Sequence, residues 1–126
     1  MANLVDAIDH FQRKLAHEID AWDLRVLLGD GAGVVIVDAR SEAAFLQEHL
    51  PQAMSLPHRN MNSESTRNLS RQAQYVTYCD GIGCNASTKG ALKLAELGFE
   101  VKELIGGIEW WKRDGYPTET ASVAIT

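Results

Sequence analysis

The sequence predicts an α/β fold built on a parallel sheet, and three observations support this class. Short β-branched and aromatic runs alternate along the chain with helical patterns, as in parallel α/β sheets. The run Val34 to Val37 is apolar on both faces, which is typical of a strand buried inside such a sheet. The chain has 126 residues, 45% of them hydrophobic, which suits one domain with one core.

The first third of the chain is predicted as two helices and the buried strand. Residues 3–16 have the apolar spacing of an amphipathic helix, which either packs on the core or contacts a partner or a second copy. Asp20 is the expected N-cap of a second helix, which ends at Gly29 and Gly31. The apolar face expected for this second helix consists of Trp22, Val26 and Leu27.

The middle of the chain is predicted as a short helix, two strands and a polar connection. Ser41 is the expected N-cap of the helix, which Pro51 ends. Strands are expected at 53–57 and 75–79, and the polar residues 58–74 between them form one or two helical turns at most. His58 and Arg59 follow a strand's carboxyl end, so they either line the mouth of a site or are solvated loop residues.

The last third is predicted as helix, strand and short helix. The first helix begins near Ser87 and ends at Gly98, and a strand at 101–105 follows. A Gly-Gly turn then leads into a helix whose Trp110 and Trp111 are expected to pack as core and lid. The apolar positions expected on the first of these helices are Leu92, Ala95 and Leu97.

Both cysteines, Cys79 and Cys84, lie in one glycine-rich loop at the carboxyl end of a predicted strand, where parallel sheets bind ligands. The loop amides, which Gly81 and Gly83 allow to converge, and the positive end of the next helix can stabilise a thiolate or a bound anion. The alternatives are that Cys79 is a buried core residue and that Cys84 packs under the loop.

Four segments together resemble the single-domain rhodaneses, a sulfurtransferase family. VVIVDAR is similar to the family's strand that ends in Asp and Arg, and FLQEHLPQAMSLP to its E-x-GHIPGA-x-x-IP segment. YVTYC resembles the strand that leads to the active cysteine, and LAELGFEVKELIGGIEWW resembles the closing helix, strand and L-x-GG-x-x-x-W signature. The resemblance covers about residues 20 to 117, and the ordered set of four motifs is specific, whereas one alone would be weak.

The resemblance implies a three-layer rhodanese-like fold, with a small central parallel sheet flanked by helices and an extra N-terminal helix. The implied organisation is an N-terminal helical extension at 1–18, the rhodanese-like domain at 19–118 and a C-terminal tail at 119–126. Cys79 would accept sulfur from a small donor as a persulfide and pass it to a thiol or cyanide acceptor, without a cofactor. The amides of an anion-binding loop would hold the charge, and its residues are Asp80, Gly81, Ile82, Gly83, Cys84, Asn85, Ala86 and Ser87. The structural residues would be Asp38, Arg40, Glu48 and His49, with Arg40 pairing with a carboxylate such as that of Glu48.

The loop departs from the usual rhodanese pattern C-R-S-G-x-R-S. It is two residues longer, carries Asp80 where a basic residue is common, and has no Arg or Lys between Cys79 and Lys89. An acidic neighbour opposes thiolate formation, so we expect thiosulfate to be a poor substrate. The longer loop is similar to that of related phosphatases, but Asn85 stands where they need an arginine, which disfavours that activity.

Two other functions stay open at this stage. Cys84 could attack a persulfide or sulfenate on Cys79 and form a disulfide, as a resolving thiol or in a redox sensor, provided that the Cα atoms lie within about 7 Å. Asp80 could instead mark a non-catalytic module that binds a protein partner, with help from the N-terminal helix. Two cysteines without a nearby histidine pattern disfavour a metal site.

Composition excludes several classes of partner. The net charge of −5 and the scattered Lys and Arg residues argue against nucleic acid. No apolar run approaches a membrane span, and the N-terminus lacks the pattern of a signal peptide. A cytoplasmic location is therefore expected, where thiols are more common than structural disulfides.

Overall fold

A computed structural model describes residues 3–31 and 33–120 of the chain. In it a five-stranded, all-parallel sheet has the order β1-β5-β4-β2-β3. The strands are β1 (Glu18–Ile19), β2 (Val34–Asp38), β3 (Met54–Ser55), β4 (Gln74–Tyr78) and β5 (Glu100–Leu104). The helices are α1 (Leu4–His17), α2 (Ala21–Asp30), α3 (Glu42–Gln47), the 3-10 turn η1 (His58–Asn60), α4 (Ala86–Glu96) and α5 (Gly107–Arg113).

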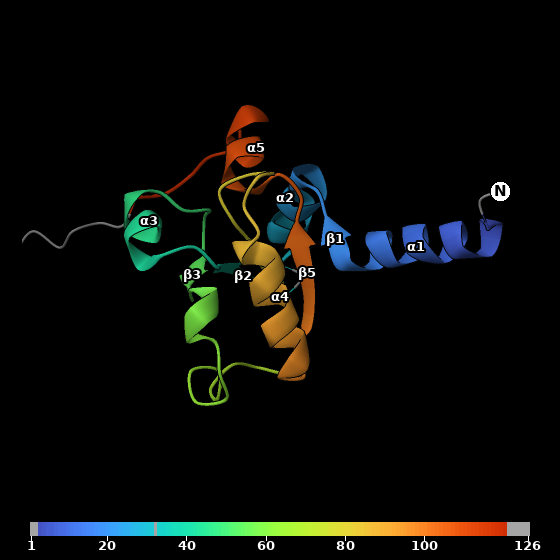
Figure 1. Cartoon of the computed structure of the whole chain (residues 1–126). Helices are drawn as coiled ribbons and strands as arrows, with labels where there is room; N and C mark the ends of the chain where they lie inside the picture. The colour runs from blue at the N-terminus through green and yellow to red at the C-terminus, as the bar shows by residue number, and fades with distance from the viewer. Residues whose placement is uncertain (1–2, 32, 121–126) are drawn as a thin grey trace, which may run out of the picture.

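Helices cover both faces of the sheet, which confirms the three-layer α/β fold (Figure 1). Alternate residues of β2 and β4 point to opposite faces, as the strand period of two requires. Ile36 and Val76 pack with Leu24 of α2 and Trp111 of α5 in one apolar cluster. On the other face, the second cluster consists of Val37, Ala39, Leu56, Met61, Tyr75, Leu94 and Phe99.

The helix caps are as predicted, whereas the predicted apolar faces of α2 and α4 are right only at Leu27 and Leu97, which pack against the apolar clusters. The Asp20 side chain accepts a hydrogen bond from the backbone amide of Asp23, and the Ser41 side chain accepts one from that of Ala44. On α2, however, Trp22 is 64% exposed, and on α4 Leu92 is 61% exposed. The side chains buried instead are Ala21 and Leu24 on α2, and Ser87, Gly90 and Leu94 on α4. The large side chains on the two buried faces are Leu24 and Leu94, which belong to the apolar clusters on opposite sides of the sheet.

Helix α1 extends away from the body of the molecule (Figure 1). None of its residues is buried, and its large apolar side chains are 58% to 79% exposed. It therefore does not pack on the core, and a contact with a partner or a second copy stays a prediction. The two-residue strand β1, which directly follows it beside β5, was not predicted.

The domain boundaries at 18/19 and 118/119 also stay predictions, and residues 1–2 and 121–126 of the two terminal segments lie outside the described residues. Glu119, the first residue assigned to the tail, exchanges backbone hydrogen bonds with His49. No helix in the described ranges is long and apolar enough to cross a membrane.

Candidate active site

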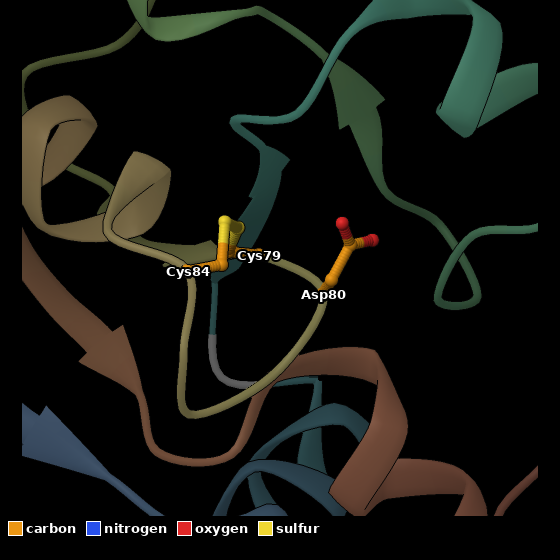
Figure 2. Close-up of side chains that lie close together, drawn as sticks. All are labelled: Cys79, Asp80 and Cys84. Carbon is orange, nitrogen blue, oxygen red and sulfur yellow. A yellow bond between two sulfur atoms is a disulfide. The ribbon is translucent and has the colours of Figure 1, made fainter.

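The glycine-rich loop connects the carboxyl end of β4 to α4 and holds both cysteines. Cys79 is the first residue after β4, and Cys84 lies two residues before α4. The sulfur atoms are joined in a disulfide, with the Cα atoms 6.1 Å apart (Figure 2). The Cys84 amide donates to the Gly81 carbonyl at 3.2 Å, a turn that brings Cys84 back over Cys79. The geometric condition for a Cys79–Cys84 bond is therefore met.

Helix α5 anchors the start of this loop. The amides of Ile108 and Glu109 donate to the carbonyls of Cys79 and Asp80, both at 2.9 Å. In a trans peptide the N–H points opposite to the C=O, so the amides of Asp80 and Gly81 point away from α5. The two sulfur atoms also stand on the side of the loop opposite to α5 (Figure 2). These two amides are thus directed to the side on which the sulfurs lie.

The other end of the loop presents the positive end of α4. The amides of Ala86, Ser87 and Thr88 donate to no protein acceptor in the described part of the chain, as expected for the first turn of a helix. The Asn85 side chain makes no capping hydrogen bond either. Amides at a helix start favour an anion nearby, and anion binding by residues 80–87 stays a prediction.

Cys79 is only 1% exposed, yet it belongs to neither apolar cluster. It lines a cavity of about 440 Å³ above the sheet edge together with Asp80, Cys84 and Ala86. The other lining residues are Ala39, Arg40, Ser41, Glu42, Ala44, Pro57, His58, Arg59 and Asn60. His58 and Arg59 therefore line the mouth, the first of the two alternatives that the sequence left open. The predicted loop residues Gly81, Ile82, Gly83, Asn85 and Ser87 line a smaller hollow of about 260 Å³ instead.

The mouth of the cavity carries positive charge beside His58. Partial burial, and then the cations Lys89, Lys93 and Arg59, lower the pKa of His58 below its usual 6.5. The imidazole is therefore mainly neutral at pH 7, and the neighbouring Arg59 is, like Arg40, a cation that lines the cavity.

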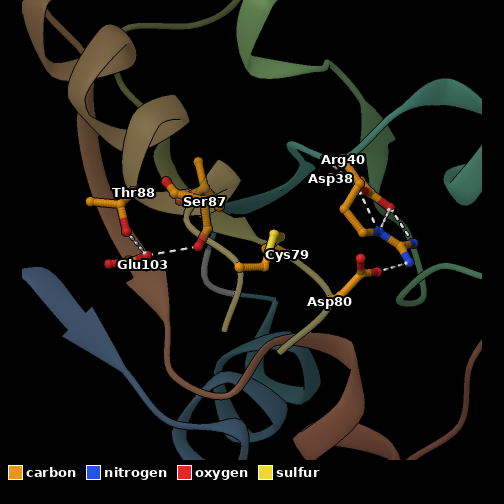
Figure 3. The surroundings of a disulfide bond; sticks show 9 residues. Asp38, Arg40, Cys79, Asp80, Ser87, Thr88 and Glu103 are labelled. Carbon is orange, nitrogen blue, oxygen red and sulfur yellow. Dashed lines mark hydrogen bonds and ion pairs between the residues drawn. A yellow bond between two sulfur atoms is a disulfide. The ribbon is translucent and has the colours of Figure 1, made fainter. Parts of the chain in front are cut away.

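Arg40 is the centre of an ion-pair network under the loop (Figure 3). It pairs with carboxylates, as expected, but they are those of Asp38 and Asp80, and the suggested partner Glu48 is wrong. The Arg40 side chain is 9% exposed, and the guanidinium donates to Asp38 at 2.7 Å and to Asp80 at 3.0 Å. From Glu48 it reaches only the backbone carbonyl, at 2.6 Å. The Glu48 carboxylate instead accepts from Lys112 and Thr118. Arg40 lies between the carboxyl end of β2 and the cysteine loop, where the Asp38 and Asp80 oxygens are nearer than the Glu48 side chain.

The Arg40 guanidinium keeps its positive charge in this network. Burial alone would lower the pKa of Arg40, but its hydrogen bonds to Asp38 and Asp80 outweigh burial and raise that pKa above the usual value. Tyr78, a residue that the sequence reading missed, donates its hydroxyl to Asp38 at 2.6 Å. Burial, and then that carboxylate, raise the pKa of Tyr78 well above 10.0. Arg40 thereby offsets part of the Asp80 charge, although no basic residue lies within the loop itself.

Ser87 does not direct its side chain to an anion in the loop. It is 4% exposed, and its hydroxyl donates to Glu103 of β5 at 2.7 Å (Figure 3). The same carboxylate oxygen accepts the Thr88 hydroxyl at 2.5 Å. Glu103 was missed because it lies on a strand far along the chain, with no local motif. Its role is to tie the start of α4 to β5, so only the backbone of Ser87 is available to an anion.

His49 packs against Phe45 of α3, and its structural role stays a prediction. Its ring stacks on Phe45 with 3.9 Å between ring centroids, and Nδ1 lies 2.8 Å from the Phe45 carbonyl oxygen. It is 8% exposed and does not line the cavity that Cys79 faces. This stacking fixes the segment between α3 and β3.

One group of potential metal ligands lies at the loop. An oxygen of Asp80 and the sulfurs of Cys79 and Cys84 lie within 4.8 Å of one another (Figure 2). Three ligands are one fewer than a closed zinc site uses, and the disulfide sulfurs are not thiolates. The expectation that this protein uses no metal stays a prediction.

Known proteins resemble the chain over nearly its whole length. The model of the rhodanese-like domain family matches residues 20–114. The thiosulfate sulfurtransferase GlpE of Coxiella burnetii is 33% identical over 112 residues, which are 87% of this chain and 95% of that protein. A sulfurtransferase of Allochromatium vinosum is 31% identical over 104 residues, 82% of this chain and 94% of that protein. The crystal structure of the BH2092 protein from Bacillus halodurans has a TM-score of 0.88 at 41% identity, covering 94% of this chain and 88% of that one.

The fold, the four sequence motifs and these matches agree, and they cover the sheet, the cysteine loop and α5 together. This chain belongs to the rhodanese-like domain family.

Proposed function

We propose that this protein is a sulfurtransferase that carries sulfane sulfur as a persulfide on Cys79. The observation that carries the proposal is the position of Cys79, which lies at the carboxyl end of β4 and lines a cavity of about 440 Å³. The amides of the next two residues, Asp80 and Gly81, are directed to the side on which its sulfur lies. The printed names of two relatives, a thiosulfate sulfurtransferase and a sulfurtransferase, support the same class of reaction.

The reaction has two balanced steps. The Cys79 thiolate attacks the sulfane sulfur of a donor such as thiosulfate, and the donor's S–S bond breaks with loss of sulfite. An acceptor such as cyanide or a thiolate then attacks the outer sulfur of the persulfide, and the electron pair of the broken S–S bond restores the thiolate. The disulfide form must first be reduced, because a bonded sulfur is not a nucleophile.

Backbone amides and charged side chains around Cys79 have different roles in this reaction. The amides of Asp80 and Gly81 and the first turn of α4 stabilise the charged sulfur. Arg59 at the mouth attracts an anionic donor, while the Asp80 carboxylate repels one. Because Arg40 pairs with Asp80, part of that repulsion is removed, and thiosulfate becomes a slow rather than an excluded donor.

Intact mass measurement tests this proposal. The protein is reduced, desalted without air and incubated with thiosulfate or another sulfane donor. We expect Cys84→Ser to gain the mass of one sulfur atom and Cys79→Ser to gain none. Sulfur on Cys79→Ser, and none on Cys84→Ser, would overturn the assignment of Cys79.

A thiol redox sensor is the second candidate, and the Cys79–Cys84 disulfide favours it. In that case mild peroxide converts the reduced protein to a form lighter by two hydrogens, at a rate that exceeds any sulfur transfer. If the mass does not fall, this candidate is removed. A non-catalytic binding module remains the third expectation, and a reduced Cys79 that resists alkylation at neutral pH would favour it.

A further inference from the structure

We propose that Cys84 discharges the sulfur carried by Cys79 as sulfide, so that the protein couples sulfane uptake to disulfide formation. This inference rests on the proposed function of Cys79 and adds a second reaction at the same site. A thiol within the protein, rather than an external acceptor, is then the first nucleophile to attack the persulfide.

The loop is already folded for this attack. The two Cα atoms are 6.1 Å apart, and the sulfurs are within bonding distance without movement of β4 or α4. The Cys84–Gly81 turn holds the second cysteine over the first. The region around the turn is open, since a side chain at Gly83 would meet no atom within 4 Å and Ile82 is 81% exposed. Cys84 can therefore withdraw from Cys79 while the persulfide forms and return afterwards.

The cavity provides the exit for the leaving group. Both cysteines line the same cavity of about 440 Å³, which His58 and Arg59 also line. The outer sulfur of a persulfide on Cys79 would occupy this space. Attack by Cys84 on the inner sulfur expels the outer one away from the loop, and Arg59 favours release of an anion on that side.

The step balances in atoms and electrons. The Cys84 thiol gives up its proton and forms a bond to the Cys79 sulfur, and the bond between that sulfur and the outer sulfur breaks. The outer sulfur takes the electron pair of that bond and the proton, and leaves as hydrosulfide. The two cysteine thiols are oxidised to the disulfide, and the sulfane sulfur is reduced to sulfide. A dithiol reductant then supplies two electrons and two protons, which reopens the disulfide for the next cycle.

An internal thiol has a concentration advantage over an external acceptor. Groups joined by a short flexible segment meet at an effective concentration of about millimolar or more, and well-oriented groups exceed that by far. An external acceptor below that concentration loses the competition. We therefore expect sulfide, rather than a persulfide of another molecule, as the main product when acceptors are dilute.

A single-turnover experiment tests the inference. Reduced wild-type protein, freed of reductant and kept without air, receives one equivalent of thiosulfate, and both sulfide and intact mass are measured. We expect one sulfide per chain, a mass two hydrogens below that of the reduced protein, and turnover that resumes only on addition of a dithiol. Cys84→Ser and Cys84→Ala should keep the added sulfur and release no sulfide. A sample without donor should keep both thiols.

The outcomes separate the two proposals. If wild type retains the added sulfur as stably as Cys84→Ser, the discharge is wrong while the persulfide on Cys79 stands. Equal sulfide release from wild type and from Cys84→Ala also overturns the discharge. If neither variant nor wild type takes up sulfur from any sulfane donor, the proposed function fails and the discharge fails with it.

Discussion

Replacement of Arg40 by methionine should destabilise the fold strongly. The guanidinium makes three contacts to the Asp38 carboxylate, at 2.7, 3.0 and 3.2 Å, and Asp38 is fully buried. Removing one partner of a buried ion pair costs about 3–5 kcal/mol, because the remaining charge is left without compensation. Asp38 keeps two hydrogen bonds, from the Tyr78 hydroxyl and the backbone amide of residue 40, so we expect the lower part of that range.

Chemical denaturation at pH 7 measures this loss of unfolding free energy. A matched control is Arg67→Met, which removes an ion pair whose two side chains are 66% and 78% exposed and should cost less than about 1 kcal/mol. The double variant Asp38→Asn with Arg40→Met should recover part of the loss, since it buries no net charge. If Arg40→Met is as stable as Arg67→Met, the network does not carry the stability ascribed to it.

The remaining predictions concern the backbone, the thiol and the response to acid. Gly107→Ala should lower the free energy of unfolding by about 2 kcal/mol or more, because φ is +61° and the new Cβ would meet the Cys79 carbonyl. Gly29→Ala, at a position in open space on α2, should instead raise it by up to about 1 kcal/mol. Denaturation curves that rank the two variants in reverse would contradict this. Asp80→Asn should lower the pH midpoint of alkylation of reduced Cys79 by at least about half a unit. This shift corresponds to the Coulomb energy in water of two negative charges within 4.8 Å of each other. An unchanged midpoint would show that Asp80 does not act on the sulfur. Hydrogen bonds from Lys112 and Thr118 lower the pKa of Glu48, so the stability that it contributes is present above its unfolded pKa near 4.5 and is lost as pH falls through the lower folded value. Glu48→Gln should therefore reduce the slope of the unfolding free energy against pH in that acid range. An equal slope in both proteins would count against this role of Glu48.

The local features of this protein follow from the sequence alone. The buried strand at 34–38, the caps at Asp20 and Ser41 and the cysteine at a strand end depend on residues near one another in the chain, so their patterns can be recognised without a structure. The family motifs extend this to the architecture and to the loop that carries Cys79.

Only the tertiary structure decides which distant groups meet. Arg40 reaches Asp80, forty residues along the chain, because β2 and β4 are neighbours whose carboxyl ends lie at one edge of the sheet. Glu103 receives the Ser87 hydroxyl because β5 pairs with β4 on the other side. Which face of α2 and α4 is buried, and how the loop turn brings Cys84 onto Cys79, depend on the same packing. A sequence states which charges and thiols exist, whereas burial and pairing depend on distances in space that no spacing along the chain encodes.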